Sequence, residues 1–185
     1  NNSNILPPYN NMRIINNTMF CNGSYELPGG ISMGSNNIIL DCNNATLMGD
    51  GIFYGIEAYS KNGIEIKNCN LRNYSISILF SGSSNGKIIN NKIYYSERKS
   101  ISLWSDSNNN YVTNNSIYES GDGFFIEGSS NNLLQNNNVI NATWDSYFIG
   151  FGSNNNILKD NEGISADQYY GLSLQDGARF NLIEG

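Results

Sequence analysis

The sequence predicts an all-β solenoid, in which the chain winds through about six to seven stacked coils. Two observations support this: a repeated segment, and apolar runs that are too short for helices. One template describes the repeats: Ser-Asn-Asn, a short apolar strand, a polar residue, an Asn pair and one more apolar residue. Its copies are SNGKIINNKI at 84–93, SNNNYVTNNSI at 107–117, SNNLLQNNNV at 130–139 and SNNNILKDNEGI at 153–164, with a looser copy, NGIEIKNCNL, at 62–71.

The second position of the Asn pair defines the period of the repeat. Its steps are 22, 24, 22 and 24 residues, and it falls on Cys69, Asn91, Asn115, Asn137 and Asn161. Each unit holds two or three apolar runs of three to five residues, split by Ser, Asn and Gly, which is typical of short strands between turns. Three strands at ~3.3 Å per residue and three turns use up one unit, so each coil pairs in parallel with the previous one.

The residues at this position are predicted to form a structural column, made up of Asn91, Asn115, Asn137 and Asn161. Asn tolerates the left-handed backbone region that a sharp turn between two sheets requires. Its amide both donates and accepts hydrogen bonds, so Asn side chains on neighbouring coils can form a ladder along the solenoid axis. One Asn residue would then both form the turn and bond to the equivalent Asn of the neighbouring coil.

The repeat copies, together with the entry segment NNIILDCNNATLMGDGI at 36–52, resemble the right-handed parallel β-helix families. These families include the NosD-like and pectate-lyase-like repeat proteins, grouped as carbohydrate-binding and sugar-hydrolase β-helices. The resemblance covers about residues 30–185 and implies a right-handed parallel β-helix solenoid. Its motifs are moderately specific for the fold and poorly specific for any activity.

Residues 1–30 fit the repeat poorly and are predicted to be an N-terminal cap, followed by a single β-helix domain at 31–185. Pro7 and Pro8 would break a strand ladder, because proline has no N–H to donate. Short strands are expected at 12–15, 19–21 and 25–27. A solenoid needs a terminal unit that covers its first core layer, and this segment is placed to supply it.

The three cysteines leave the disulfide pairing open. Cys21 and Cys42 flank the first turn, and the related families often have a paired Cys near the entry, so the resemblance favours a Cys21–Cys42 disulfide. The alternatives are a Cys42–Cys69 bridge between neighbouring coils and no bridge at all. Connectivity cannot be read from sequence alone.

The composition argues against nucleic acid as a partner and against a membrane span. The net charge is −6, the sequence pI is about 4.5, and the ten Lys and Arg are scattered. A nucleic-acid-binding protein would gather them into a basic patch. No apolar run approaches the ~20 residues that span a bilayer. No signal peptide is visible, so export would require a targeting segment that has been removed.

An extracellular or cell-surface location is expected from the low charged fraction of 14% and from seven Asn-x-Ser/Thr triplets. These triplets are candidate glycosylation sites, although a chain this rich in Asn and Ser produces several by chance. Asn114 is the least favoured, because it sits in the Asn-pair turn and would point inward. The candidates are Asn1, Asn16, Asn22, Asn44, Asn73, Asn114 and Asn141.

The absence of histidine removes the Ser-His and Cys-His nucleophile pairs and the His-rich metal sites. The resemblance to NosD would imply copper handling, but the four Met are scattered and no Cys-x-x-Cys occurs. The catalytic sets of polygalacturonase-like β-helices (Asn-Thr-Asp, Asp-Asp, Gly-His-Gly and Arg-Ile-Lys) are also missing. No catalytic residue and no resident metal or cofactor are therefore predicted, apart from the Ca²⁺ considered next.

One column of carboxylates could still carry chemistry. Asp122, Asp145 and Asp167 precede strands at steps of 23 and 22, with Glu119 nearby. Carboxylates stacked ~5 Å apart repel one another and could be held by Ca²⁺, or a pair could act as acid and nucleophile on a glycoside. The simpler interpretation is that Asp sits where turns favour it, exposed and screened. No Arg or Lys recurs beside the column to receive an acidic sugar, which argues against a lyase.

Aromatic residues offer a second possible site. Trp104, Phe125, Phe148 and Tyr169 could line one sheet face and stack on sugar rings. They could equally belong to the core or be buried by another subunit.

The expected function is a non-enzymatic structural module outside a cell, on a virion or in an extracellular filament. The alternative is a carbohydrate-binding or carbohydrate-active β-helix: a lyase, hydrolase or epimerase. Surface glycans or other copies of the chain are the expected partners. Self-assembly is indicated because Ile183 takes the strand position of Leu158, and the segment Asn1–Ile5 of another copy would supply the next Asn pair. Such strand addition would join the copies head to tail.

Overall fold

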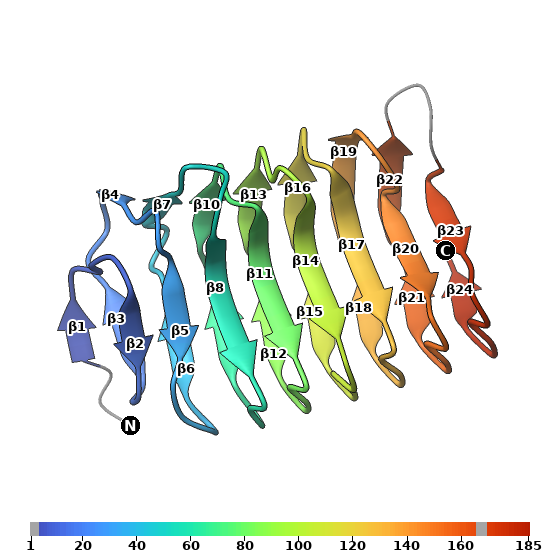
Figure 1. Ribbon diagram of the computed structural model, residues 1–185, viewed down its shortest axis with the longest axis horizontal. Coiled ribbons are helices and arrows are strands. Elements are labelled where there is room, and N and C mark those ends of the chain that lie inside the picture. The colour runs from blue at the N-terminus through green and yellow to red at the C-terminus, as the bar shows by residue number, and fades with distance from the viewer. Residues whose placement is uncertain (1–3, 166–169) are drawn as a thin grey trace.

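The computed structural model describes residues 4–165 and 170–185, and every regular element in those residues is a β-strand. The strands form three parallel sheets of eight, nine and seven strands. Consecutive strands of the chain pass from one sheet to the next, so each coil contributes one strand to each sheet (Figure 1). The predicted all-β solenoid is confirmed, with about seven turns.

The strands are short because each coil must turn three corners. The eight-stranded sheet contains β2 (Met12–Ile14), β5 (Ile31–Met33), β8 (Tyr54–Tyr59), β11 (Ile76–Ser81), β14 (Lys99–Trp104), β17 (Asp122–Glu127), β20 (Tyr147–Gly150) and β23 (Leu172–Leu174). The nine-stranded sheet contains β1 (Asn4–Leu6), β3 (Thr18–Phe20), β6 (Ile39–Asp41), β9 (Glu65–Lys67), β12 (Lys87–Ile89), β15 (Tyr111–Thr113), β18 (Leu133–Gln135), β21 (Ile157–Lys159) and β24 (Leu182–Glu184). The seven-stranded sheet contains β4 (Ser24–Glu26), β7 (Thr46–Met48), β10 (Asn70–Arg72), β13 (Lys92–Tyr94), β16 (Ser116–Tyr118), β19 (Asn138–Ala142) and β22 (Glu162–Ser165).

The parallel register stacks like residues along the solenoid axis. Ile78 lies opposite Ile101, which lies opposite Phe124, and Tyr147 follows on the next strand. All four side chains are buried in one continuous interior cluster. Removing such apolar columns from water stabilises each coil against its neighbours.

In the structure, the Asn column forms a hydrogen-bonded ladder at the corner between the nine-stranded and seven-stranded sheets. The side-chain oxygen of Asn115 accepts from the backbone N–H and from the Nδ2 of Asn91, both at 3.0 Å. Its own Nδ2 donates to the carbonyl oxygen of Ile88 at 2.9 Å and to Oδ1 of Asn137 at 3.0 Å. In the next coil, the backbone N–H and the Nδ2 of Asn137 donate to Oδ1 of Asn161, at 2.9 and 3.0 Å. Each side chain therefore satisfies the backbone of a neighbouring coil.

The left-handed turn residue lies one position earlier than expected. The φ angles of Asn90, Asn114 and Asn136 are 56°, 55° and 53°, whereas the ladder residues that follow them lie outside the left-handed region. One residue turns the chain and the next points its side chain inward. Asn114 is exposed and Asn115 is buried, so the expectation that Asn114 points inward is wrong.

Two more ladders, which the sequence reasoning missed, run along the corner between the eight-stranded and nine-stranded sheets. The N–H of Ser107 donates to Oγ of Ser129 at 3.1 Å. Three residues further along each coil, the N–H of Asn110 donates to Oδ1 of Asn132 at 2.8 Å, and Asn132 does the same to Asn156 at 2.9 Å. The sequence could have predicted these ladders, because the Ser and Asn positions of the repeat template recur together with the Asn pair.

A disulfide joins Cys42 to Cys69, and Cys21 is free. The favoured Cys21–Cys42 pairing is therefore wrong. Cys42 and Cys69 meet at the same corner on neighbouring coils, where their Cα atoms are 4.8 Å apart, within the reach of a disulfide. In the preceding coil the register brings the buried Phe20 beside Cys42, and Cys21 lies one residue beyond it. Neighbouring residues of a strand point to opposite faces, so Cys21 does not face Cys42.

Residues 12–26, which were assigned to the cap, form a coil of the solenoid itself. Strands β2, β3 and β4 pair in parallel with β5, β6 and β7 of the next coil. Beyond this first coil lies β1, which pairs with β3 alone. Pro7 and Pro8 fall in the link between β1 and β2, where a missing N–H breaks no strand ladder, and Pro8 is buried.

Candidate functional site

The outer face of the eight-stranded sheet gathers aromatic and charged side chains from neighbouring coils. Phe125 of β17 stacks on Phe148 of β20, with ring centroids 4.5 Å apart and planes within 6°. One coil earlier, the Nζ of Lys99 lies 3.3 Å from the centroid of Phe125 and 4.7 Å from that of Trp104. None of these four side chains belongs to the interior cluster. The register therefore assembles them outside the sheet.

Lys99 extends the carboxylate column by one coil. It lies opposite Asp122 on the neighbouring strand. Its step of 23 residues to Asp122 equals the step from Asp122 to Asp145. One basic residue therefore adjoins this column, although no Arg or Lys recurs along it. Lys99 could have been found from the sequence, since extending the column by one repeat unit toward the N-terminus reaches it.

Asp122 and Asp145 are buried, at 7% and 6% exposure, rather than exposed as the simpler interpretation held. Oδ1 of Asp122 accepts the N–H of Asp145 at 3.1 Å, and Oδ1 of Asp145 accepts the N–H of Tyr170 at 3.1 Å. Both carboxylates thus act as rungs between coils, as the Asn side chains do. Burial raises the pKa of Asp122 to about 6, although the bond from Asp145 and the nearby charge of Lys99 oppose this shift.

The remaining members of the expected carboxylate column do not join this pair. Asp167 lies outside the described residues, and the register brings Tyr170 to the position that follows Asp145. Glu119 lies in the turn after β16 and is exposed. Within residues 4–165 and 170–185, no group of three or more His, Cys, Asp or Glu side chains is placed to hold a metal ion. Binding of Ca²⁺ at Asp122 and Asp145 therefore stays a prediction.

Lys99 is held in a partly apolar environment. Burial lowers the pKa of its ammonium group, and the charge of Asp122 is the largest effect in the opposite direction. The Nε1 of Trp104 is the one buried side-chain nitrogen or oxygen of the described chain that lacks a hydrogen-bond partner. A lysine whose pKa is lowered by burial thus lies beside an aspartic acid whose pKa is raised by burial, and perturbed pairs of this kind are candidates for acid–base chemistry.

The comparisons with known proteins agree with this architecture. A family model described as "Right handed beta helix region" matches residues 54–185, which is more than half of the chain. The chain belongs to the right-handed β-helix family. No curated protein matches it.

Two solved structures are similar to this chain at low sequence identity. Both are mutants of the periplasmic alginate epimerase AlgG. The double mutant is 16% identical with a TM-score of 0.50, and the single mutant is 15% identical with a TM-score of 0.43. Each alignment covers 91% of this chain and 62% of the AlgG chain, so this β-helix spans about three fifths of that structure. At this level of identity the likeness extends to the fold alone.

The aromatic side chains of this β-helix are largely occupied with one another. Phe125 and Phe148 are each 9% exposed, and because their rings face each other, those flat faces are not free to stack on a sugar. Phe151 is half exposed and lies 5.9 Å from Phe148. Tyr169 lies outside the described residues. A sugar on this face would meet ring edges, Phe151 and the partly exposed Trp104.

Every glycosylation candidate that the structure describes is exposed and lies at a corner of the β-helix. Asn1 lies outside the described residues. The others are Asn16 between β2 and β3, Asn22 between β3 and β4, Asn44 between β6 and β7, Asn73 after β10, Asn114 between β15 and β16, and Asn141 in β19. No helix that could cross a membrane occurs in the described part of the chain.

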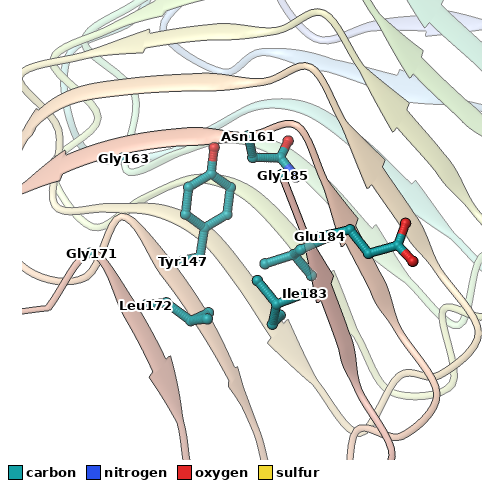
Figure 2. A pocket seen from close by; sticks show the side chains of 9 residues that line it. Tyr147, Asn161, Gly163, Gly171, Leu172, Ile183, Glu184 and Gly185 are labelled. Atoms are coloured by element: carbon teal, nitrogen blue, oxygen red, sulfur yellow. The ribbon is translucent and has the colours of Figure 1, made fainter.

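Beside the last described coil lies a cavity of about 310 Å³, whose lining includes Tyr147, Leu172 and Ile183 (Figure 2). Ile183 lies opposite Leu158, as the step of 25 residues predicted. Residues 1–3, which would supply the Asn pair of a neighbouring copy, lie outside the described residues. Head-to-tail assembly therefore stays a prediction.

Proposed function

We propose that this β-helix is a non-enzymatic structural module of an extracellular or cell-surface protein. The observation that carries the proposal is the use of its buried polar side chains. The Asn, Ser and Asp ladders bond each coil to its neighbour, and Trp104 alone leaves a buried side-chain polar atom unpaired in the described residues. A fully bonded polar network of this kind rigidifies the fold. The result is a rod suited to holding other groups at a fixed spacing.

The Cys42–Cys69 disulfide supports the extracellular part of this proposal. Stable disulfides such as Cys42–Cys69 are typical of proteins outside the reducing cytosol. The exposed Asn-x-Ser/Thr triplets are accessible to glycosylation, and one protein of similar fold is described as periplasmic. Intact-mass analysis of native material tests both points, since it reveals attached glycans and a disulfide together.

A depolymerisation screen tests the non-enzymatic character. The purified protein is incubated with neutral and uronate polysaccharides, and products are followed by mass spectrometry and NMR. We expect no shorter chains, no unsaturated sugars and no epimerised residues. Products that form with the wild type and disappear in Asp122→Asn would contradict the proposal.

A carbohydrate-active function is the second candidate, and the pair formed by Lys99 and Asp122 favours it. AlgG, a protein of similar fold, is named as an alginate epimerase. In this function Lys99, with its lowered pKa, would accept a proton from the sugar and Asp122 would return one. Loss of a measured activity in both Lys99→Met and Asp122→Asn, with unchanged circular dichroism, is the expected result for this function.

Self-association extends the structural proposal. Strands β1 and β24 are the first and last strands in the order of the nine-stranded sheet, and head-to-tail assembly would pair β24 of one copy with β1 of the next. Leu182 and Ile183 of β24 are each 47% exposed. We expect oligomers in light scattering at high protein concentration, and fewer of them in Ile183→Asp. A wild-type protein that stays monomeric at high concentration would contradict head-to-tail assembly.

A further inference from the structure

A cavity lies at the corner between the seven-stranded and eight-stranded sheets and spans three successive coils. We call it the corner cavity; its volume is about 320 Å³. Its floor is made of Ser96, Ser120 and Gly121, and both serines are buried. Its rim consists of exposed side chains, those of Tyr95, Glu97, Glu119, Thr143 and Trp144.

The rim residues Tyr95 and Glu119 occupy a turn position that favours Asn. They follow strands β13 and β16, and the register makes Asn73 and Asn141 their equivalents in the flanking coils. All four residues are left-handed, with φ of 58° at Tyr95 and 48° at Glu119. Asn adopts this conformation readily, whereas Tyr and Glu do so at a cost in stability. Local strain that is retained at a cavity is typical of a functional site.

The carboxylates of Glu97 and Glu119 are free to meet a ligand. Neither makes a hydrogen bond or an ion pair within the described chain. The serines of the floor, by contrast, are already engaged. Oγ of Ser120 accepts the N–H of Ser96 at 3.2 Å and donates to the carbonyl oxygen of Tyr118 at 3.1 Å. The charged groups that the cavity offers are therefore two acceptors on its rim, beside the hydroxyl groups of Tyr95 and Thr143.

Two aromatic rings complete the rim. Tyr95 is 46% exposed and Trp144 is 38% exposed, so their flat faces are more accessible than those of the stacked Phe125 and Phe148. The N–H of Trp144 donates to the carbonyl oxygen of Gly121 at 3.1 Å, which fixes its backbone above the cavity floor. No Lys or Arg side chain lines the cavity.

We infer that the corner cavity binds an uncharged sugar residue. The apolar C–H face of a pyranose packs on Trp144 or Tyr95, and its hydroxyl groups donate to Glu97 and Glu119. The same two carboxylates repel a uronate, since no cation is present to offset their charge. This site lies at the corner that directly precedes the strands carrying Lys99 and Asp122, neither of which lines it. It does not depend on the proposed structural role.

Titration of the intrinsic fluorescence of the full chain tests this inference. The probes are methyl glycosides of neutral hexoses and of N-acetylhexosamines, the methyl glycoside of galacturonic acid with its carboxylate free, and choline. We expect a neutral glycoside to bind with a saturable fluorescence change, and galacturonate to bind at least about tenfold more weakly. Saturable binding of choline alone would assign the cavity to cations and overturn the inference, as would the absence of binding by every neutral probe.

Matched variants separate the corner cavity from other surfaces. Trp144→Ala should weaken binding of the neutral glycoside by about tenfold or more, whereas Tyr111→Ala, an exposed tyrosine on the nine-stranded sheet, should leave it unchanged. Because Trp144→Ala removes one of the two Trp reporters, calorimetry is used for that variant. Glu119→Gln should reduce the difference in affinity between the neutral glycoside and galacturonate, since the glutamine amide keeps a hydrogen-bond acceptor and loses the charge. Equal binding by wild type and Trp144→Ala would place the sugar elsewhere and refute the inference.

Discussion

Replacement of Asn115 by Leu is the sharpest test of the ladder that joins the coils. The leucine side chain is close in size to asparagine but has no donor or acceptor. It leaves the N–H of Asn91 without its acceptor at 3.0 Å and removes the donor that Ile88 receives at 2.9 Å. It also removes both side-chain bonds along the ladder, to Asn91 and to Asn137. The backbone turn is unaffected, because the left-handed residue is Asn114.

The size of the effect follows from the buried groups that lose their partners. Each unsatisfied buried donor or acceptor costs about 1–3 kcal/mol, so two of them predict a loss of roughly 2–6 kcal/mol in the free energy of unfolding. Asn115 is fully buried, so water cannot replace the missing partners. A loss of this size is a large part of the stability of a typical domain.

Urea denaturation of the unglycosylated protein measures this free energy, and Asn114→Gly is the matched control. Asn114 is the exposed neighbour of Asn115, and glycine adopts its φ of 55° without strain. We expect the control to change the free energy of unfolding by no more than about 0.5 kcal/mol. Equal stabilities for Asn115→Leu and Asn114→Gly would refute the ladder argument.

Two further predictions concern stability. Removing the disulfide with Cys42→Ala and Cys69→Ala opens a loop of 27 residues, and the chain-entropy relation gives a loss of about 3.5 kcal/mol in urea denaturation, whereas Cys21→Ser should change little. An equally large loss in Cys21→Ser would contradict this assignment. The pKa of Asp122 is raised from 3.8 to about 6, so between these values the folded protein retains a proton that the unfolded chain has lost. Stability should therefore fall as pH rises from about 4 to about 6, and Asp122→Asn should flatten that part of the profile; an unchanged slope would show that Asp122 titrates normally.

The period of the Asn pair was enough to predict the fold, because stacked coils require equivalent residues at equivalent positions. Cys69, Asn91 and Asn115 lie on successive coils at the corner that the period assigned to them. The turn geometry was harder to predict, since both members of an Asn pair have the same propensity. The structure distinguishes them, because Asn114 has the left-handed backbone and the side chain of Asn115 points inward.

The candidate site was less predictable because burial on an outer face depends on neighbouring coils. Asp122 was expected to be exposed, and the side chains stacked around it bury it. Lys99 was missed because the column was defined by residues of the same charge rather than by residues at the same register position. The corner cavity was also missed, since Tyr95 and Trp144 follow no shared sequence template and line one cavity only when three coils are stacked.

Native-state hydrogen exchange tests most directly the central claim that buried polar side chains hold the coils together. The backbone N–H groups of Asn91, Asn115 and Asn137 each donate to a side-chain oxygen of the next coil. If these bonds join the coils, the three amides should exchange only on global unfolding, as slowly as the strand amides of the interior. Rapid exchange of these amides, with slow exchange in the adjoining strands, would show that the corners open independently and would contradict the account.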